Sequence, residues 1–296
     1  MPQFDCKGPD PQPRRASFTP PRLATDCHAH VIGPAGLYPF VDDRAYTPPD
    51  ATLQDYLHVV DTLGFQRIVL VQPSMHGTDN TVMLDALKTA RAAGHDGCAI
   101  AGIAPDCSDN DLETLHNRGV RGVRINMIYR GGKAANVDAV SQVATRMRTM
   151  NWCLEMLVDV SMLGRELLMY DKLGVPLVID HLGHMPASKG PDDPGFQALL
   201  ELVRRGSTWV KLSGAYRLAE GATFPKADIA MMARALVEAA PTRMLWGSDW
   251  PHTMCSVPMP NDGELLDLLA EWVPDERTRN MILADNPAEL YGFTRA

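Results

Sequence analysis

Short apolar segments recur along this chain, separated by polar loops and by segments with helical periodicity. Eight of them are six or seven residues long, and they lie at 25–31, 67–72, 98–104, 122–128, 153–158, 176–181, 208–213 and 243–249. Strands that are apolar on both faces are typical of parallel sheets covered by helices on either side. The pattern therefore predicts an α/β protein with eight parallel strands.

The segments between these strands are amphipathic. Residues 53–64, for example, have apolar positions three and four residues apart and end in a glycine that can stop a helix. Eight strand–helix units in 296 residues favour a closed (β/α)8 TIM barrel. We expect a single barrel domain over 23–296 with C-terminal capping helices, preceded by an extended arm over 1–22 that contains PDPQP and TPPR.

Composition narrows the class of protein and its partners. Apolar residues make up 45% of the chain and charged residues 22%, and the net charge is −8. An acidic protein of this kind is not expected to bind nucleic acid or an anionic membrane surface. The six cysteines contain no CxxC pair, and the chain shows no signal peptide and no apolar stretch of 18 residues. We expect a cytoplasmic protein, and the proline-rich arm suggests a homo-oligomer.

Candidate chemistry lies at the ends of three predicted strands. His28 and His30 end the first strand on one face, His181 ends the sixth, and Asp249 ends the eighth. The carboxyl ends of barrel strands meet on one rim, where the active sites of such barrels lie. Alternatives exist for each residue, since paired histidines need no ligand and Asp249 could cap a helix. Their common rim nevertheless indicates one catalytic or metal site.

Arginines and polar side chains surround this predicted rim. Arg124 and Asn126 share one face of the fourth strand, Arg130 lies in the loop beyond it, and Arg217 follows the seventh strand. An arginine within a buried strand is costly unless an anionic group meets it, and guanidinium groups suit carboxylates. We therefore expect a small substrate with more than one acidic group. Ser74 and His76 could hold a further substrate oxygen, although a polar turn explains them equally well.

Three motifs carry a resemblance to a known family. The segments DCHAHV at 26–31, DHLGH at 180–184 and WGSDWPH at 246–252 together resemble the amidohydrolase superfamily. Within it, the chain is similar to the 2-pyrone-4,6-dicarboxylate lactonase group, and the similarity includes RAYTP at 44–48, QPSMHGTDN at 72–80 and DNPAELYGF at 285–293. The resemblance implies a lactonase that opens a carboxylated or sulfonated lactone in the catabolism of aromatic or sugar acids.

The resemblance also implies roles for individual residues. His28, His30, His181 and Asp249 match the catalytic set, in which the aspartate activates the hydrolytic water. The positions that contact the substrate in this group are matched by Tyr46, Ser74, Arg124, Arg130 and Arg217. Two positions depart from the pattern, because His184 stands where the group has an arginine and Leu157 lies where a tyrosine is expected. A muconolactone or a sugar-diacid lactone is therefore at least as well supported as the pyrone dicarboxylate.

The metal and the reaction class stay open at this stage. His28, His30, His181 and Asp249 would suit one divalent ion, zinc first, but the lactonase group is thought to work without a metal. We therefore expect either no cofactor or one divalent metal. The alternatives are a metal-dependent decarboxylase of a small unsaturated or aromatic acid, a lactone isomerase, and a binding protein on a barrel scaffold. Release of carbon dioxide would identify a decarboxylase, whereas ring opening with net acid release would identify a lactonase.

Overall fold

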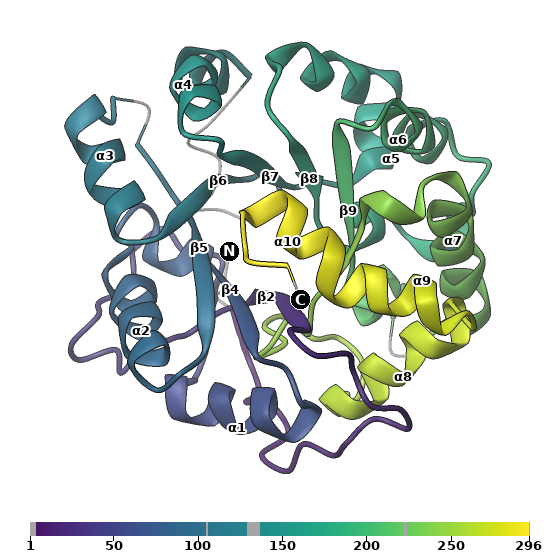
Figure 1. Ribbon diagram of the computed structural model, residues 1–296, viewed down its shortest axis with the longest axis horizontal. Helices are drawn as coiled ribbons and strands as arrows, with labels where there is room; N and C mark the ends of the chain where they lie inside the picture. Colours follow the sequence, from purple (N-terminus) through teal and green to yellow (C-terminus); the bar gives the residue numbers. More distant parts are fainter. Residues whose placement is uncertain (1–3, 105, 129–136, 222–223, 296) are drawn as a thin grey trace.

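Eight parallel strands form one sheet that curves into a barrel (Figure 1). The computed structural model describes residues 4–104, 106–128, 137–221 and 224–295. Neighbouring strands follow the chain order, which confirms the predicted TIM barrel. The strands are β2 (Thr25–Ala29), β4 (Arg67–Val71), β5 (Asp96–Ala101), β6 (Val120–Asn126), β7 (Cys153–Leu157), β8 (Leu177–Ile179), β9 (Thr208–Leu212) and β10 (Met244–Trp246).

The strand boundaries differ from the predicted ones by a few residues. β5 and β6 each begin two residues earlier than predicted, and β10 ends at Trp246, so that Asp249 lies in the loop after it. Polar residues such as Asp96 and Arg121 are found at the strand starts, where the apolar pattern gives no signal. The eight-strand count is unaffected by these shifts.

The barrel closes between its first and last strands. Ala29, at the end of β2, pairs in parallel with Trp250, and the backbone amide of His30 donates to the carbonyl of Trp250 at 2.8 Å. The amide of Asp249 donates to the carbonyl of His28, also at 2.8 Å. Closure therefore joins the two chain segments that carry the HxH pair and the aspartate.

Helices surround the barrel in the order expected for strand–helix units (Figure 1). The sequence sets their ends locally: Thr52 and Asp55 form a capping box at the start of α1, and Gly64 ends it with φ 83°. The α-helices are α1 (Leu53–Leu63), α2 (Thr81–Ala92), α3 (Asp109–Asn117), α4 (Val137–Thr149), α5 (Val160–Leu163), α6 (Pro194–Arg205), α7 (Lys226–Ala239), α8 (Asp262–Trp272), α9 (Glu276–Asn280) and α10 (Asn286–Tyr291).

Shorter helical turns lie mainly in the loops at the strand ends. The 3₁₀ segments are η1 (Ser74–His76), η2 (Gly164–Leu173), η3 (His181–Gly183), η4 (Ala187–Lys189), η5 (Ala215–Leu218) and η6 (Pro241–Arg243), and η7 (Met281–Asp285) is a π-helical turn. Among the described residues, no helix is both long enough and apolar enough to span a membrane.

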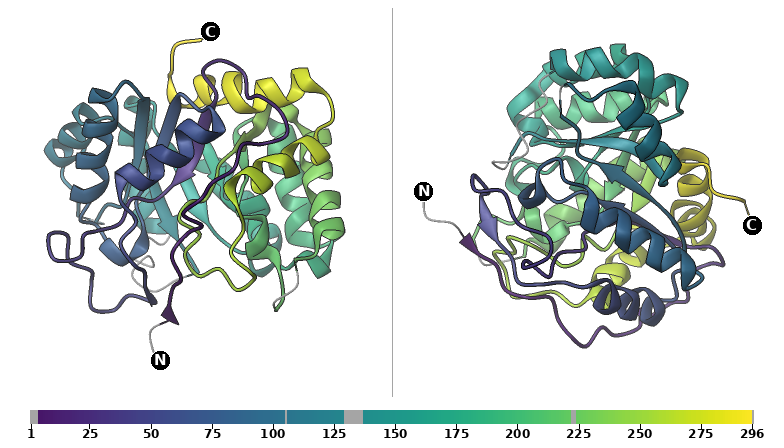
Figure 2. Two further views of the ribbon diagram at one scale, coloured as in Figure 1. Left: turned by 90° about the horizontal axis from the view of Figure 1, so that it is seen from below. Right: turned by 90° about the vertical axis from the view of Figure 1, so that its left-hand side faces the viewer.

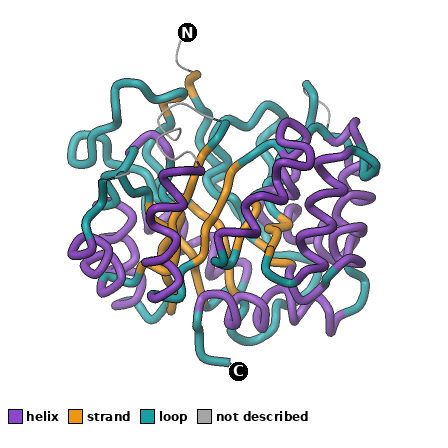
Figure 3. The backbone as a smooth tube through the Cα atoms, turned by 90° about the horizontal axis from the view of Figure 1, so that it is seen from above, coloured by secondary structure: helices purple, strands orange, loops and turns teal. Residues whose placement is uncertain are grey.

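The two ends of the barrel are covered differently (Figures 2 and 3). Helix α10 crosses the amino-terminal end of the strands, where Tyr291 is 3% exposed and packs on a cluster that includes Cys27, Cys98 and Cys153. The N-terminal segment runs to the opposite end, where β1 (Phe4–Asp5) pairs with β3 (Tyr46–Thr47). The carboxyl end is therefore built from loops, and it holds the candidate site.

Candidate active site

Four side chains meet at the carboxyl end of the barrel. The Nε2 atoms of His28 and His30 are 3.3 Å apart. Asp249 Oδ1 lies 3.8 Å from the Nε2 atoms of both His28 and His181. All four residues are buried. The structure thus brings together the four residues that the sequence singles out as a catalytic set.

Backbone geometry and two glycines allow this convergence. His181 and Asp249 have φ values of 53° and 64°, which non-glycine residues rarely adopt and which cluster at functional sites. A Cβ atom on Gly214 would lie 2.7 Å from both Asp249 Oδ2 and His181 Nδ1, and one on Gly247 would lie 2.7 Å from His28 Cβ. The site therefore needs glycine at both positions, a requirement that the strand pattern does not reveal.

Asp249 is held as a carboxylate. Arg217 donates to it twice, from Nε to Oδ2 and from Nη2 to Oδ1 at 3.1 Å, and the Tyr216 hydroxyl donates to Oδ2 at 2.7 Å. Burial opposes the charge, but the Arg217 guanidinium outweighs it and holds the pKa of Asp249 well below its usual value. Asp249 is therefore ionised at neutral pH.

Hydrogen-bond directions assign the protons of the HxH pair. Lys211 Nζ, which can only donate, lies 3.1 Å from His28 Nδ1, so this nitrogen accepts and the proton of His28 resides on Nε2. His30 Nδ1 lies 2.8 Å from the carbonyl of Val71, so His30 donates there and its Nε2 accepts. One consistent chain of donors thus runs from Lys211 through His28 to His30, and it makes His28 Nε2 a donor.

The three histidines are neutral. Burial, with Lys211 next, holds the pKa of His28 well below its usual value, and burial lowers the pKa of His30 to about 3. Burial also places the pKa of His181 well below its usual value, and Ser213 Oγ lies 2.9 Å from His181 Nδ1. The group therefore offers neutral imidazoles around one carboxylate.

A buried group of charged residues lies beneath the histidines, and the sequence interpretation missed most of it. Lys211 forms ion pairs with Glu155 and, at 3.5 Å, with Asp180. Arg124 Nη2 lies 3.2 Å from Asp180 Oδ2, and its Nε lies 3.7 Å from Glu155 Oε1. The sequence did contain a signal for this group, because charged residues at inward-facing positions of apolar strands need partners inside the barrel.

The electrostatics of this group favour a charged lysine. Burial opposes the charge on Lys211, but Glu155 and Asp180 outweigh it and raise the lysine's pKa. Burial and the neighbouring Asp180 raise the pKa of Glu155 to about 7. The pKa of Asp180 is lowered, because Lys211 and Arg124 outweigh the effect of burial. The donor to His28 Nδ1 is therefore an ammonium group.

Most of the predicted substrate-contacting residues line one small cavity above the histidines. Its walls include Tyr46, Ser74, Arg124, Asn126 and Arg217, together with His30, Leu157, His181 and Thr253. Burial raises the pKa of the Tyr46 hydroxyl, so it stays protonated. Both arginines have protein partners here, Arg124 with Asp180 and Arg217 with Asp249, so an anionic substrate would share or exchange these contacts.

One predicted substrate contact, His76, is placed differently. His76 is buried, but its Nδ1 lies 3.2 Å from the carbonyl of Pro39 and its ring lies beside Phe40, away from the cavity walls. Arg130 lies outside the described residues. His184 is close to the site, with its ring centroid 5.9 Å from that of His181.

The residues do not fit a divalent metal ion in this arrangement. Ligand atoms of His28, His30 and Asp249, and of His28, Asp180 and His181, lie within 4.8 Å of one another. Both groups include His28, whose Nε2 carries a proton and whose Nδ1 faces the Lys211 ammonium. Both oxygens of Asp249 are also held by Arg217. Metal binding would require these contacts to break.

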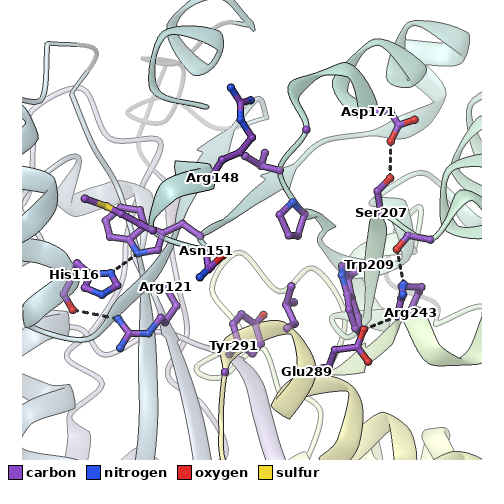
Figure 4. A pocket seen from close by; sticks show the side chains of 18 residues that line it. His116, Arg121, Arg148, Asn151, Asp171, Ser207, Trp209, Arg243, Glu289 and Tyr291 are labelled. Carbon is purple, nitrogen blue, oxygen red and sulfur yellow. Dashed lines mark hydrogen bonds and ion pairs between the residues drawn. The ribbon is translucent and has the colours of Figure 1, made fainter. Parts of the chain in front are cut away.

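A much larger cavity lies at the opposite end of the barrel (Figure 4). It has a volume of about 980 Å³, and its walls include His116, Trp209 and Tyr291. Its arginines bind the protein itself: Arg243 donates to the Gly206 carbonyl and pairs with Glu289 at 3.1 Å, and Arg148 donates to the Leu173 carbonyl. The amino-terminal end of such barrels serves stability rather than chemistry. We therefore assign the candidate active site to the smaller cavity at the carboxyl end.

The barrel carries an HxH pair, a third histidine and an aspartate on one rim. This combination of fold and site is typical of one class of enzymes. The chain belongs to the amidohydrolase family, whose model matches residues 25–293. The family resemblance seen in the sequence is thereby confirmed.

Individual relatives narrow the comparison. The chain is 37% identical to the 4-sulfomuconolactone hydrolase of Rhizobium radiobacter, over 97% of this chain and 96% of that protein. It is 35% identical to the 2-pyrone-4,6-dicarboxylate hydrolase of Comamonas testosteroni, over 94% and 93%. A crystal structure of a probable 2-pyrone-4,6-dicarboxylic acid hydrolase from Acinetobacter baumannii, with citric acid bound, superposes with a TM-score of 0.81 at 28% identity and covers 92% of this chain and 100% of that one.

Proposed function

We propose that this protein hydrolyses a small lactone that carries at least one carboxylate or sulfonate group. The observation that carries this proposal is the convergence of an ionised Asp249 with His28, His30 and His181, beside Arg124 and Arg217. The names of the relatives, which are hydrolases of a sulfonated and of a dicarboxylated lactone, support the substrate class.

Asp249 acts as the general base in this proposal. It removes a proton from a water molecule, whose oxygen attacks the lactone carbonyl carbon. In the free protein the Nε2–H of His28 donates to His30 Nε2. In the reaction it would exchange this bond for one to the carbonyl oxygen as negative charge develops there. The bond from the carbonyl carbon to the ring oxygen then breaks, and the ring oxygen takes the proton back from Asp249. The product is a ring-opened hydroxy or oxo acid with one new carboxylate.

Arg217 links substrate binding to the strength of this base. While it pairs with both oxygens of Asp249, the aspartate is a weak base, because the guanidinium stabilises the carboxylate. A substrate anion attracts the same guanidinium. When Arg217 turns toward the substrate, the pKa of Asp249 rises toward a useful range, so the base becomes effective when substrate is present.

We propose that this reaction uses hydrogen-bond donors in place of a metal ion. The donor directions around His28 support this choice, since its Nε2 carries the proton that a metal would displace. The neutral imidazoles and Arg124 would polarise the carbonyl and orient the anionic groups. A cytoplasmic location and a homo-oligomer stay predictions from the sequence.

A panel of carboxylated and sulfonated lactones tests the function. Loss of ring absorbance with release of one acid equivalent is expected, and a chelator should leave the rate unchanged. Incorporation of one oxygen atom from ¹⁸O-labelled water would distinguish hydrolysis from isomerisation. Carbon dioxide release would instead establish a decarboxylase, and activity that is lost with the chelator and restored by zinc would overturn the proposal of a metal-free reaction.

A further inference from the structure

A second cavity adjoins the candidate active site on one side of the rim. It has a volume of about 470 Å³ and lies among the loops that follow β6, β7, β8 and β9. This volume is within the range of about 300–1,000 Å³ that is common for small-molecule sites. Its apolar walls include Met127, Ile128, Val158, Met162, Leu163 and Leu218.

The two cavities are neighbours, and Arg217 forms part of the boundary between them. Arg217 lines both of them. Asn126 and Leu157 line the catalytic cavity, and the residues that follow them, Met127 and Val158, line the second one. The catalytic cavity has a volume of about 10 Å³, so a lactone binds there only when lining side chains such as Arg217 move. A substituent on that lactone would reach the second cavity where Arg217 now lies.

Among the described residues that line the second cavity, the polar ones are Asp159, His184 and Arg217, and the others are apolar. Asp159 is used at the start of α5, where its Oδ1 accepts from the backbone amide and the hydroxyl of Ser161 at 2.9 and 2.6 Å. Burial, and next the charge on Arg217, lower the pKa of His184 to about 4, so its ring is neutral. Among the described lining residues, Arg217 at the border is the one cationic group.

The catalytic cavity itself has a different character. Tyr46, Ser74, Arg124 and Asn126 present hydroxyl, guanidinium and amide groups to the catalytic cavity. A molecule that occupied both cavities would therefore meet polar and cationic groups in the catalytic cavity and mainly hydrocarbon in the second one. A second carboxylate placed among Ile128, Val158 and Met162 would lose its hydration without gaining a partner there.

We propose that this second cavity is an apolar subsite for a hydrocarbon substituent of the lactone. The substrate would be amphipathic, with its acidic group near Arg124 and Arg217 and its hydrocarbon arm against Ile128, Val158 and Met162. This inference rests on the proposed lactone hydrolysis and specifies its substrate further.

A matched series of lactone acids tests the subsite. The compounds differ only in one ring substituent, which is hydrogen, methyl, propyl or carboxymethyl. In the wild-type protein, kcat/KM is expected to rise about three- to fourfold for each added methylene, as for hydrocarbon buried from water. The carboxymethyl compound is expected to be poorer than the propyl compound.

Two exposed methionines provide a variant and its control. Met162, on α5, lines the cavity and is 78% exposed, whereas Met169, on η2, is 53% exposed and does not line it. Met162→Glu should lower the ratio of kcat/KM for the propyl and unsubstituted lactones about tenfold. Met162→Leu should preserve this ratio, and Met169→Glu should leave both rates unchanged.

Calorimetry separates the two proposals. The ring-opened acids of the same series are titrated into the protein, so that the effect of the arm on affinity is measured without turnover. Tighter binding with a longer alkyl arm supports the subsite even if no lactone is hydrolysed, a result that would refute the proposed function alone. If alkyl length changes neither kcat/KM nor affinity, if carboxymethyl is preferred, or if Met169→Glu matches Met162→Glu, the subsite is refuted.

Discussion

The backbone amide of Asp249 donates a 2.8 Å hydrogen bond to the carbonyl of His28. This bond joins the segment after the last barrel strand to the first strand. The same contact that closes the barrel therefore brings the aspartate to the HxH pair. Assembly of the site and completion of the fold depend on one another, so variants that weaken this seam should lose activity and stability together.

Asp249→Asn removes the proposed base with little change in shape. We expect kcat to fall about 10²- to 10⁴-fold, as for loss of a general base, while affinity for the ring-opened acid is retained. Steady-state kinetics and calorimetry measure the two effects. Asp192→Asn, at an exposed position, is the control and should leave both unchanged. An Asp249→Asn protein with normal kcat would remove the aspartate from the mechanism.

Gly214→Ala tests how tightly the site is packed. The new Cβ would lie 2.7 Å from Asp249 Oδ2 and His181 Nδ1, and φ at this residue is 56°. Gly292→Ala is the control, because Gly292 is also in the left-handed region, with φ 74° and ψ 27°, and nothing lies within 4 Å of its Cβ. Both should lose about 1–2 kcal/mol of unfolding free energy for the left-handed backbone. Only Gly214→Ala should also lower kcat, and equal kinetics for the two variants would contradict the argument.

Lys211→Met removes one of the two cations, Lys211 and Arg124, that face the buried carboxylates of Glu155 and Asp180. We expect a loss of about 3–5 kcal/mol of unfolding free energy, as for a broken buried ion pair. Adding Glu155→Gln to this variant should recover part of the lost unfolding free energy, because the side chains at positions 155 and 211 are then both neutral. Lys88→Met, on the exposed face of α2, should change little. Urea unfolding measures all three proteins.

The same lysine variant tests the tautomer of His28. In the wild-type protein, ¹⁵N chemical shifts should show His28 protonated at Nε2, because Lys211 donates to Nδ1. In the double variant, the proton is free to move to Nδ1, where Asp180 Oδ1 lies 3.3 Å away. Zinc binding, followed by calorimetry, should then become tighter than in the wild type. Unchanged shifts and affinity would show that Lys211 does not fix the tautomer.

Arg217→Gln removes the main partner of Asp249. Because the guanidinium holds the pKa of Asp249 well below its usual value, its loss should raise that pKa. The acid limb of the kcat/KM profile should then move to higher pH, and KM should rise because the substrate anion loses a contact. An acid limb that stays in place would mean that Arg217 does not control this base.

Acid should destabilise the fold through its buried neutral histidines. The pKa of His184 is about 4 in the folded protein against 6.5 for the unperturbed group, so the unfolded chain binds a proton that the folded one does not. The contribution of neutral His184 to the unfolding free energy is complete above pH 6.5. It declines as the pH falls toward 4, by up to about 1.4 kcal/mol per pH unit. His184→Gln should flatten this slope in urea unfolding. His58→Gln, at an exposed position on α1, should leave the slope unchanged.

Hydrophobic periodicity predicted the barrel because each strand is buried on both faces, and the motifs at the strand ends predicted which side chains would meet. The predicted strand ends were less accurate, since Asp96 pairs with Arg67 and Arg121 lies within β6 at a shift in register, although neither residue is apolar. Lys211 and Glu155 went unnoticed because each is a single charge within an apolar run, and their partnership depends on strands that are distant in sequence. The pairing of Arg217 with Asp249 likewise follows from the fold alone.

Helix α10 and Tyr291 cover the amino-terminal end of the barrel, so a substrate would have to enter the catalytic cavity through the loops at the other end. The lactone would therefore enter and the ring-opened acid would leave by the same route, and the two could not occupy it together. Turnover would slow as product accumulates, and the product should act as a competitive inhibitor whose strength follows the affinity of Arg124 and Arg217 for its new carboxylate.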